Sequence, residues 1–396
     1  MKRQEAAMVR VHEAVVVGGG LTGLGAAHAL ARAGVDTLHL APKGRPDART
    51  SALMMPSVQY LAEAGLLADP AAIGTALEAI RIIDATDRLV RAPETLFEAR
   101  EAGLEAFGWN LPNARLAEAF EAAGRALPGL TTLDIGMSAM AAGENGSHRL
   151  TLGDGSIVEA ALVVGADGKG SPVRGAAGLR VRERAFRQAA LVCDLTLERP
   201  LEGVSVEFHY PDGPFTLVPA GENRANLVWI DLPERLEAAR GAGEAGFAAA
   251  LMAKSKGLFG ALKPVTGAFV FPLSTLGVDL AGRDGVVLVG ESAHAFPPIG
   301  AQGLNLGLRD VADLARVIAL EGGRQEGWAE RVSADYARSR APDLLRTGAM
   351  VDGLFRSLLS EMLPAQTARA GGLWALKLLP GLRRRAFGLG MGATGR

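Results

Sequence analysis

Glycines near the start of the chain are the residues whose spacing most directly indicates chemistry. Gly18, Gly20 and Gly23 form the pattern Gly-x-Gly-x-x-Gly after a short apolar, β-branched run, and Leu21 and Thr22 open a segment rich in Ala and Leu. Such glycines allow a tight turn and let the backbone approach a pyrophosphate, which the N–H groups and dipole of a helix N-terminus stabilise. The loop therefore predicts a dinucleotide site. The alternative is a glycine-rich turn without a ligand.

A second loop combines an acid, prolines and glycines in the segment 285–318. Glu291 follows an apolar strand and can hydrogen-bond a polyol, and Pro298 stiffens the loop that follows. Gly300 and Gly303 let N–H groups of the next helix face a flat ring that becomes anionic on reduction. Between these two loops, Asp167 and Gly168 end another strand. Three strand-to-loop transitions thus carry the candidate site.

The end of the second strand departs from the dinucleotide-binding pattern. That position usually carries an Asp or Glu that hydrogen-bonds ribose hydroxyls. Here Ala41 occupies it, and no acid is adjacent. The first loop is therefore weaker evidence when taken alone.

Other reactive residue types have simpler explanations. Cys193 is the single cysteine, which excludes an intramolecular disulfide, and a small buried strand residue is favoured over a nucleophile. His294 could serve in acid–base chemistry, but packing or hydrogen bonding behind the loop is favoured. His209 and Tyr210 could face a substrate, against an outward or core-filling role. No serine–histidine–aspartate or metal-ligand cluster is visible in the sequence.

The predicted elements that position these residues begin with a β-α-β unit. Its parts are a strand over 13–17, a helix over 21–33 and a strand over 37–40. Further predictions are helices over 52–65, after Asn113, over 305–320 and from 336 onward, a hairpin turning at 153–155, and short antiparallel strands from 186 to 271.

These elements predict an α/β protein: a Rossmann-like dinucleotide-binding fold, an inserted, mainly antiparallel β substrate domain and a C-terminal helical segment. The predicted dinucleotide-binding domain comprises residues 8–80, 109–180 and 281–335. The substrate domain comprises 81–108 and 181–280, and the C-terminal helical region 336–396.

Composition narrows the class of protein. The chain has 396 residues, 48% of them hydrophobic, which is enough for two domains. A net charge of −1 gives no basic field for nucleic acid. The single cysteine fits a reducing cytoplasm, and the first apolar run predicts a strand rather than a signal peptide.

In order and spacing, the three loop segments resemble the aromatic-hydroxylase flavoproteins typified by p-hydroxybenzoate hydroxylase. The likeness is closest to the 2-octaprenyl-6-methoxyphenol hydroxylase group of ubiquinone biosynthesis. It covers nearly the whole chain, and it includes the segment 47–53 and the pairs Gly213–Pro214 and Val228–Trp229.

This resemblance implies that the Rossmann-like domain is an FAD-binding domain, with FAD as cofactor and NAD(P)H as co-substrate. It also implies that no catalytic protein nucleophile is needed. The family usually has Asp at position 291, so Glu291 is a second departure. The implied cofactor-binding residues are Gly18, Gly20, Leu21, Thr22, Gly23, Arg49, Arg115, Asp167, Gly168, Glu291, Pro298, Gly300, Gly303, Leu304 and Asn305. Leu304 and Asn305 would act through their backbone N–H groups; for Arg115, a solvated helix arginine is an equal alternative.

The implied activity is an O2-consuming monooxygenase that hydroxylates the ring of a polyprenylated phenol. Alternatives that share the fold are a hydroxylase of small soluble aromatics, a reductase of prenyl double bonds and a flavin-binding accessory subunit of a quinone-synthesis complex. A homo-oligomer is compatible with each of these roles.

The chain's last segment combines apolar residues with Arg369, Lys377 and Arg383–Arg385, and has no acid after Glu361. This pattern favours peripheral contact with the inner face of the membrane. A helical pair packed on the FAD domain, or a subunit contact, is the alternative.

Overall fold

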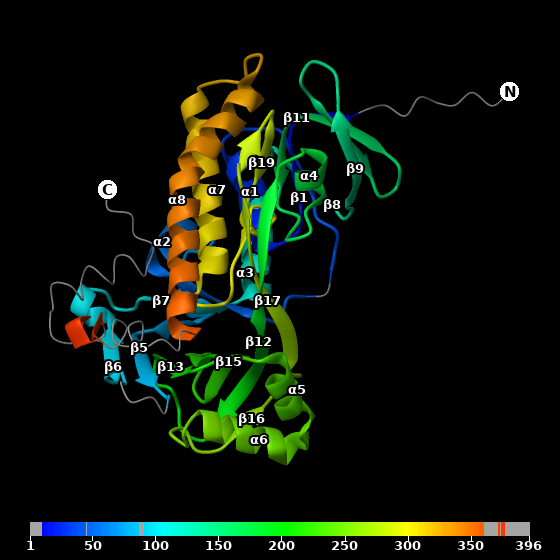
Figure 1. The fold of residues 1–396 in the computed structure, drawn as a ribbon. Coiled ribbons are helices and arrows are strands. Elements are labelled where there is room, and N and C mark those ends of the chain that lie inside the picture. Colours follow the sequence, from blue (N-terminus) through cyan, green and yellow to red (C-terminus); the bar gives the residue numbers. More distant parts are fainter. Residues whose placement is uncertain (1–9, 45, 87–90, 360–370, 373, 377–396) are drawn as a thin grey trace.

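The computed structural model describes residues 10–44, 46–86, 91–359, 371–372 and 374–376. Two large sheets are arranged end to end, and the long helices run beside the first of them (Figure 1). The helices are α1 Leu21–Arg32, α2 Met55–Glu63, α3 Asn113–Arg125, α4 Pro172–Ala176, α5 Pro233–Gly241, α6 Gly243–Lys254, α7 Gln302–Glu321 and α8 Trp328–Leu359, with short turns η1 Pro70–Ala72, η2 Ala99–Ala102 and η3 Gly290–Ser292.

The first sheet has the strand order β18-β19-β11-β1-β2-β8, and all neighbours from β19 to β8 are parallel. One face packs against α1, α7 and α8, and the other against α4 and the β9–β10 hairpin. Because both faces are covered, the strands are apolar at successive positions. The strands are β1 Arg10–Val17, β2 Thr37–Leu40, β8 Leu130–Leu133, β9 Met137–Ala142, β10 His148–Leu152, β11 Ile157–Gly165, β18 Gly282–Arg283 and β19 Val286–Leu288.

The second sheet has the order β20-β17-β12-β15-β14-β13-β5-β6 and is antiparallel except where β5 meets β13. Phe208, Phe215 and Trp229 on one face form a core with Leu236 of α5 and Leu251 of α6. Its strands are β5 Ala79–Asp84, β6 Thr95–Glu98, β12 Val181–Leu197, β13 Val204–Tyr210, β14 Gly213–Pro219, β15 Arg224–Asp231, β16 Leu262–Pro264, β17 Phe269–Val278 and β20 His294–Ala295.

A small third sheet joins the two large ones. It consists of β3 Thr50–Met54, β4 Thr75–Leu77 and β7 Gly108–Pro112. The helix predicted over 52–65 is therefore wrong at its start, because residues 50–54 pair with β7 instead. Backbone pairing overrides the helix propensity of the Ala-Leu-Met-Met sequence, and α2 begins only at Met55, where Pro56 suits a first turn.

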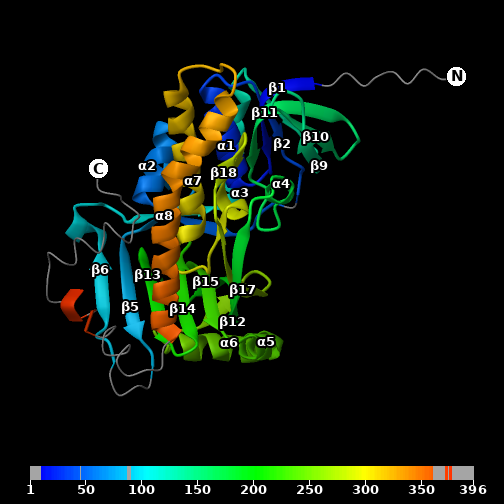
Figure 2. The ribbon, with the colours of Figure 1, turned by 45° about the horizontal axis from the view of Figure 1, so that its top comes forward.

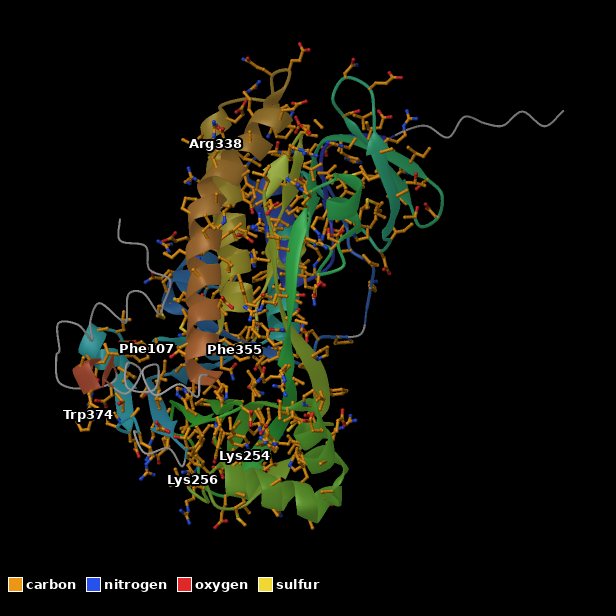
Figure 3. The ribbon with its side chains drawn as sticks, viewed as in Figure 1. Phe107, Lys254, Lys256, Arg338, Phe355 and Trp374 are labelled. Carbon is orange, nitrogen blue, oxygen red and sulfur yellow. The ribbon has the colours of Figure 1, made fainter. Side chains whose placement is uncertain are left out.

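Helix α8 connects the two large sheets, running alongside the first and ending at the second (Figure 2). Phe355 lies near its end (Figure 3) and meets Phe186 edge-to-face at 4.5 Å. Asp352 binds Arg184 at 3.2 Å. Most of the basic tail lies outside the described residues. Among the described helices, none has the length and apolarity needed to cross a membrane.

Candidate functional site

The three predicted loops meet at one edge of the parallel sheet. β1 leads into Gly18, β11 into Asp167 and β19 towards Glu291. The carboxyl ends of parallel strands share an edge, and ligands of such sheets bind there. The topology therefore brings together segments that lie far apart in the sequence.

The glycine loop forms a cradle that only glycine permits. Gly18 has φ +127°, and a Cβ built there would lie 2.1 Å from the carbonyl oxygen of Ala166. A Cβ on Gly23 would lie 2.0 Å from the carbonyl oxygen of Gly18. At Gly20, by contrast, a built Cβ meets nothing within 4 Å, and no side chain caps α1. Uncapped N–H groups beside open space suit the pyrophosphate of a dinucleotide.

Two side chains hold this loop in place. The Nε2 of His39, on buried β2, lies 2.9 Å from the carbonyl oxygen of Gly18, and burial lowers the pKa of this imidazole. Thr22 fits between Gly290 and Gly307, where built Cβ atoms would lie 2.9 and 2.8 Å from its Oγ1. The predicted Thr22 thus packs α1 against α7. His39 escaped sequence analysis because it sits in an ordinary buried strand.

Arg49 lies at the same edge, in the field of Glu291. The guanidinium is bound by Asp47 at 2.8 Å, and this hydrogen bond, with the charges of Asp47 and Glu291, raises the pKa of Arg49. Asn113 also donates to Asp47 at 2.8 Å. Asp47 and Asn113 therefore fix a cation beside the loops. Arg115, on α3, lies 3.5 Å from Glu118 and is largely exposed, and no contact joins it to the loops.

Asp167 has a structural task that the sequence did not reveal. Its carboxylate accepts from the Ser171 hydroxyl at 2.5 Å and from Val173 N–H at 2.9 Å, which secures the start of α4. Gly168 follows with φ +83° and open space around a built Cβ. Arg174 is buried and donates to the carbonyl of Ser292 at 2.8 Å, tying this loop to the one after β19.

The loop before α7 turns sharply at Gly300 and Ala301, with φ +64° and +54°. The Asn305 side chain is fully used: its oxygen accepts from Met54 N–H at 2.9 Å and Ser57 hydroxyl at 2.7 Å, and its nitrogen donates to two carbonyls. Asn305 thus locks α7 onto β3 and α2. The Asn305 side chain is therefore not available to a ligand, whereas the Leu304 N–H lies in the first turn of α7 and has no intrahelical acceptor.

His294 lies behind this loop rather than in it. It is 3% exposed, and its Nε2 lies 2.6 Å from Oδ2 of Asp310, which also accepts from Gly290 N–H at 2.8 Å. Arg340 of α8 donates to the other oxygen of Asp310 at 2.8 Å. Burial and the contact with Asp310 support the packing role favoured for His294.

The face of the second sheet opposite its core meets the loop before α7. Ile299 packs there against Ala190 and Ile230, beside the half-buried Val192 and Val228. These apolar side chains form the surface nearest the loop on which an aromatic substrate could lie.

The candidates on strands β12 and β13 divide between the two faces. Tyr210 points away from the loop, donating to the Lys254 carbonyl of α6 at 2.8 Å, whereas His209 pairs with Glu207 at 3.2 Å on the other face. Cys193 is buried in the core of the sheet, as predicted.

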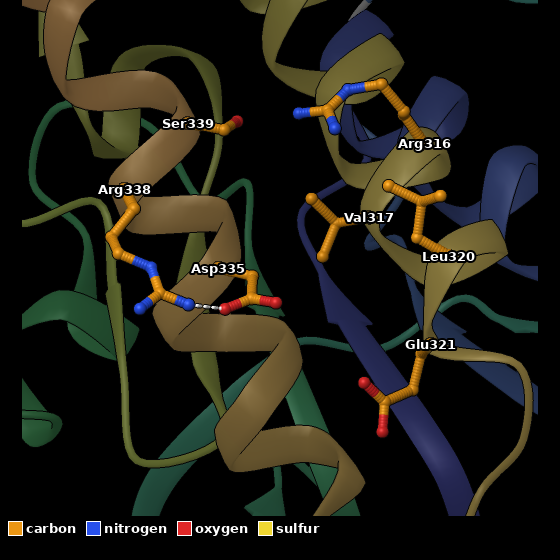
Figure 4. Close-up of a pocket in the computed structure, with 7 residues that line it drawn as sticks. All are labelled: Arg316, Val317, Leu320, Glu321, Asp335, Arg338 and Ser339. Carbon is orange, nitrogen blue, oxygen red and sulfur yellow. Dashed lines mark hydrogen bonds and ion pairs between the residues drawn. The ribbon is translucent and has the colours of Figure 1, made fainter.

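A separate pocket of about 330 Å³ lies between α7 and α8 (Figure 4). Arg316 and Arg338 line it, but each is paired with an aspartate three residues earlier on its own helix. The pocket sits near the carboxyl end of α7, roughly 20–30 Å along the helix from the turn at Gly300 and Ala301. It is therefore not part of the site at the sheet edge. Among the described residues, no cluster suits a metal ion.

Comparisons with known proteins agree with this geometry. Residues 11–342 match the family described as FAD binding domain. The chain is 31% identical to ubiquinone hydroxylase UbiL of Rhodospirillum rubrum, covering 95% of this chain and 88% of that protein. It is 29% identical to 3-demethoxyubiquinol 3-hydroxylase of Escherichia coli, and the match covers 96% of this chain and 98% of that protein.

Solved structures show the same fold. p-Nitrophenol 4-monooxygenase PnpA of Pseudomonas putida superposes with a TM-score of 0.78 at 21% identity, covering 98% of this chain and all of that one. The predicted fold class and cofactor are confirmed. The chain belongs to the FAD binding domain family, as an FAD-dependent aromatic-ring monooxygenase.

Proposed function

We propose that this protein hydroxylates the aromatic ring of a polyprenylated phenol in ubiquinone biosynthesis, using NAD(P)H and O2. The observation that carries the proposal is near full-length similarity to two hydroxylases named for ubiquinone substrates. The sheet edge fits the cofactor, because the glycine cradle is open only at Gly20 and the first turn of α1 is uncapped.

FAD, when bound, would supply the redox chemistry and the activation of O2. The protein's residues would bind and orient FAD and shield the reacting ring from water. The glycine loop would hold the pyrophosphate, Arg49 would lie along the dinucleotide, Glu291 would meet the ribityl hydroxyls, and Gly300, Gly303, Leu304 and Asn305 would present the α7 N-terminus to the ring. The segments with Asp167, Gly168 and Pro298 would frame the site, and Arg115 would stay at its margin.

The division into domains is part of this proposal. Residues 79–84 and 95–98 join the second sheet through β13, which supports assigning 81–108 to the substrate domain together with 181–280. Ile299 and Phe355 meet the substrate-facing side of that sheet, so the ring would bind between the two domains, where apolar contacts exclude water.

A prenylated substrate implies contact with a membrane. Met350 and Leu354 are exposed on the last turns of α8, and Trp374 is 47% exposed (Figure 3). Together with the basic tail, these side chains would contact the cytoplasmic face of the inner membrane. Deleting residues 360–396 should leave FAD binding intact and weaken association with anionic liposomes. Unchanged association would refute this contact.

The function is tested by deleting the gene in its host and profiling quinones and precursors by mass spectrometry. A prenylated phenol lacking one ring oxygen should accumulate and disappear on complementation. A normal profile would exclude the quinone role in a host without a second hydroxylase. An accessory subunit would purify without flavin, whereas the proposed enzyme retains FAD and consumes O2 with its substrate.

A further inference from the structure

The strand end that lacks its usual acid lies directly against the glycine loop. Gly18 N–H donates to the Leu40 carbonyl at 2.9 Å, and a Cβ built on Gly19 would lie 3.3 Å from the Cα of Ala41. This is where the adenosine ribose of a dinucleotide sits in such folds, next to an Asp or Glu on the second strand. Here β2 itself supplies no carboxylate.

The neighbouring strand supplies one. β8 pairs in parallel with β2, with Leu133 opposite Leu40, and Ala41 N–H donates to the Leu133 carbonyl at 2.9 Å. The next residue is Asp134. Because paired strands lie about 4.8 Å apart, Asp134 starts only one strand spacing from Ala41, at the same edge of the sheet.

The carboxylate of Asp134 leans towards the segment that follows β2. Its Oδ1 accepts from Lys43 N–H at 2.6 Å, and the Lys43 ammonium lies 3.7 Å from Oδ2. The Asp134 side chain is still 52% exposed. Since a carboxylate can accept about four hydrogen bonds, it keeps acceptor sites for hydroxyl donors.

The other carboxylates of this edge are engaged or distant. Asp47 holds Arg49 and Asn113, and Asp167 holds the start of α4. Glu291 follows β19, which β11 and β1 separate from β2. Among the described residues, Asp134 is the carboxylate whose contacts place it beside Ala41.

We propose that Asp134 replaces the missing strand-end acid and accepts hydrogen bonds from the ribose hydroxyls of the FAD adenosine, with Lys43 fixing its orientation. This role of Asp134 concerns affinity for FAD and not the choice of substrate. If Asp134 does not contact the ribose, the proposed role in quinone synthesis still stands; if the substrate is not a quinone precursor, the role of Asp134 still stands.

The test measures binding of FAD, and of an FAD analogue whose adenosine lacks both ribose hydroxyls, to the FAD-free full-length protein by flavin fluorescence. The wild type should bind the analogue about ten- to hundredfold more weakly than FAD. Asp134→Ala should bind FAD more weakly by a similar factor and lose most of this discrimination. Comparing two ligands on one variant cancels any general shift of the Lys43 segment.

Two further variants complete the design. Ala41→Glu, in the Asp134→Ala background, should restore the discrimination by returning an acid to β2. Asp36→Asn is the control: it removes an acid that lies just before the other end of β2, where Asp36 binds His12. This variant should keep the wild-type affinity for FAD and the wild-type discrimination against the analogue. If Asp134→Ala does not fold, Asp134→Asn should show a partial loss. Full discrimination in the Asp134 variants, or none in the wild type, would overturn the proposal.

Discussion

Replacing Gly20 and Gly23 separately with alanine would distinguish the two tasks of the glycine loop. Gly20 has φ −76° and ψ 171°, an extended conformation open to any residue, and nothing lies within 4 Å of its built Cβ. Gly20→Ala should therefore leave the free energy of unfolding of the FAD-free protein within about 1 kcal/mol of wild type. At Gly23 the built Cβ lies 2.0 Å from a carbonyl oxygen, so alanine must displace backbone, at a cost of roughly 1–3 kcal/mol or more.

FAD binding should respond differently. The new methyl group at position 20 would occupy the space in which the pyrophosphate meets the N–H groups of α1. Losing one hydrogen bond to a charged group costs about 1.5–3 kcal/mol, so FAD should bind about ten- to hundredfold more weakly. Gly23→Ala should also weaken FAD binding, but only in parallel with a lower free energy of unfolding, because it displaces the backbone of the loop.

The assays are urea unfolding of the FAD-free protein and FAD titration followed by flavin fluorescence. The informative variant is Gly20→Ala, because it separates affinity from folding. If it folds normally and binds FAD as tightly as wild type, the pyrophosphate does not lie beside Gly20. The assignment of the loop would then be wrong, whatever the fold.

Three further predictions use groups outside the loop. Burial, together with the charge of Asp194, raises the pKa of the Cys193 thiol to about 12, so a thiol reagent at pH 8 should label it only on unfolding; rapid native labelling would contradict this. Burial opposes ionisation of Asp343, but Arg309 and Arg340 outweigh it and lower the pKa of the carboxyl. Its stabilisation is therefore present above the unfolded pKa of about 4 and lost as pH falls, and Asp343→Asn should flatten the acid limb of a pH series of urea unfolding. Phe355→Ala should cost about 3–5 kcal/mol in the same unfolding assay, and a loss below 1 kcal/mol would refute tight packing of α8 on the second sheet.

The parts of the fold that the sequence predicts are those with local patterns. The β-α-β unit follows from an apolar run, three spaced glycines and an Ala- and Leu-rich helix, and the structure matches it within a residue at the helix end. The hairpin at 153–155 follows from turn residues between alternating strands. In each case neighbouring residues alone determine the element.

The third sheet could not be predicted in this way. β3 is a strand because it pairs with β7 some 60 residues later, and nothing within 50–54 shows that partner. Likewise, Asp167 and Asn305 belong to recognisable loops, yet only the fold shows that their side chains hold protein groups. Motifs identify which segments meet a ligand; they do not separate the side chains that touch it from those that build the loop.

Asp310 illustrates why that distinction matters for mechanism. One carboxylate joins the N–H of Gly290 and the ring of His294, both in the segment after β19, to the guanidinium of Arg340 on α8. The side chains of Asp310, His294 and Arg340 are almost wholly buried. Gly290 has φ +61° and packs against Thr22, so its position sets both the turn that presents Glu291 and the contact with the glycine loop. Removing one member of a buried ion pair leaves the other unbalanced and costs several kcal/mol. We therefore expect Arg340 on α8 to act on the loops at the sheet edge through Asp310, and His294 to belong to this support rather than to proton chemistry.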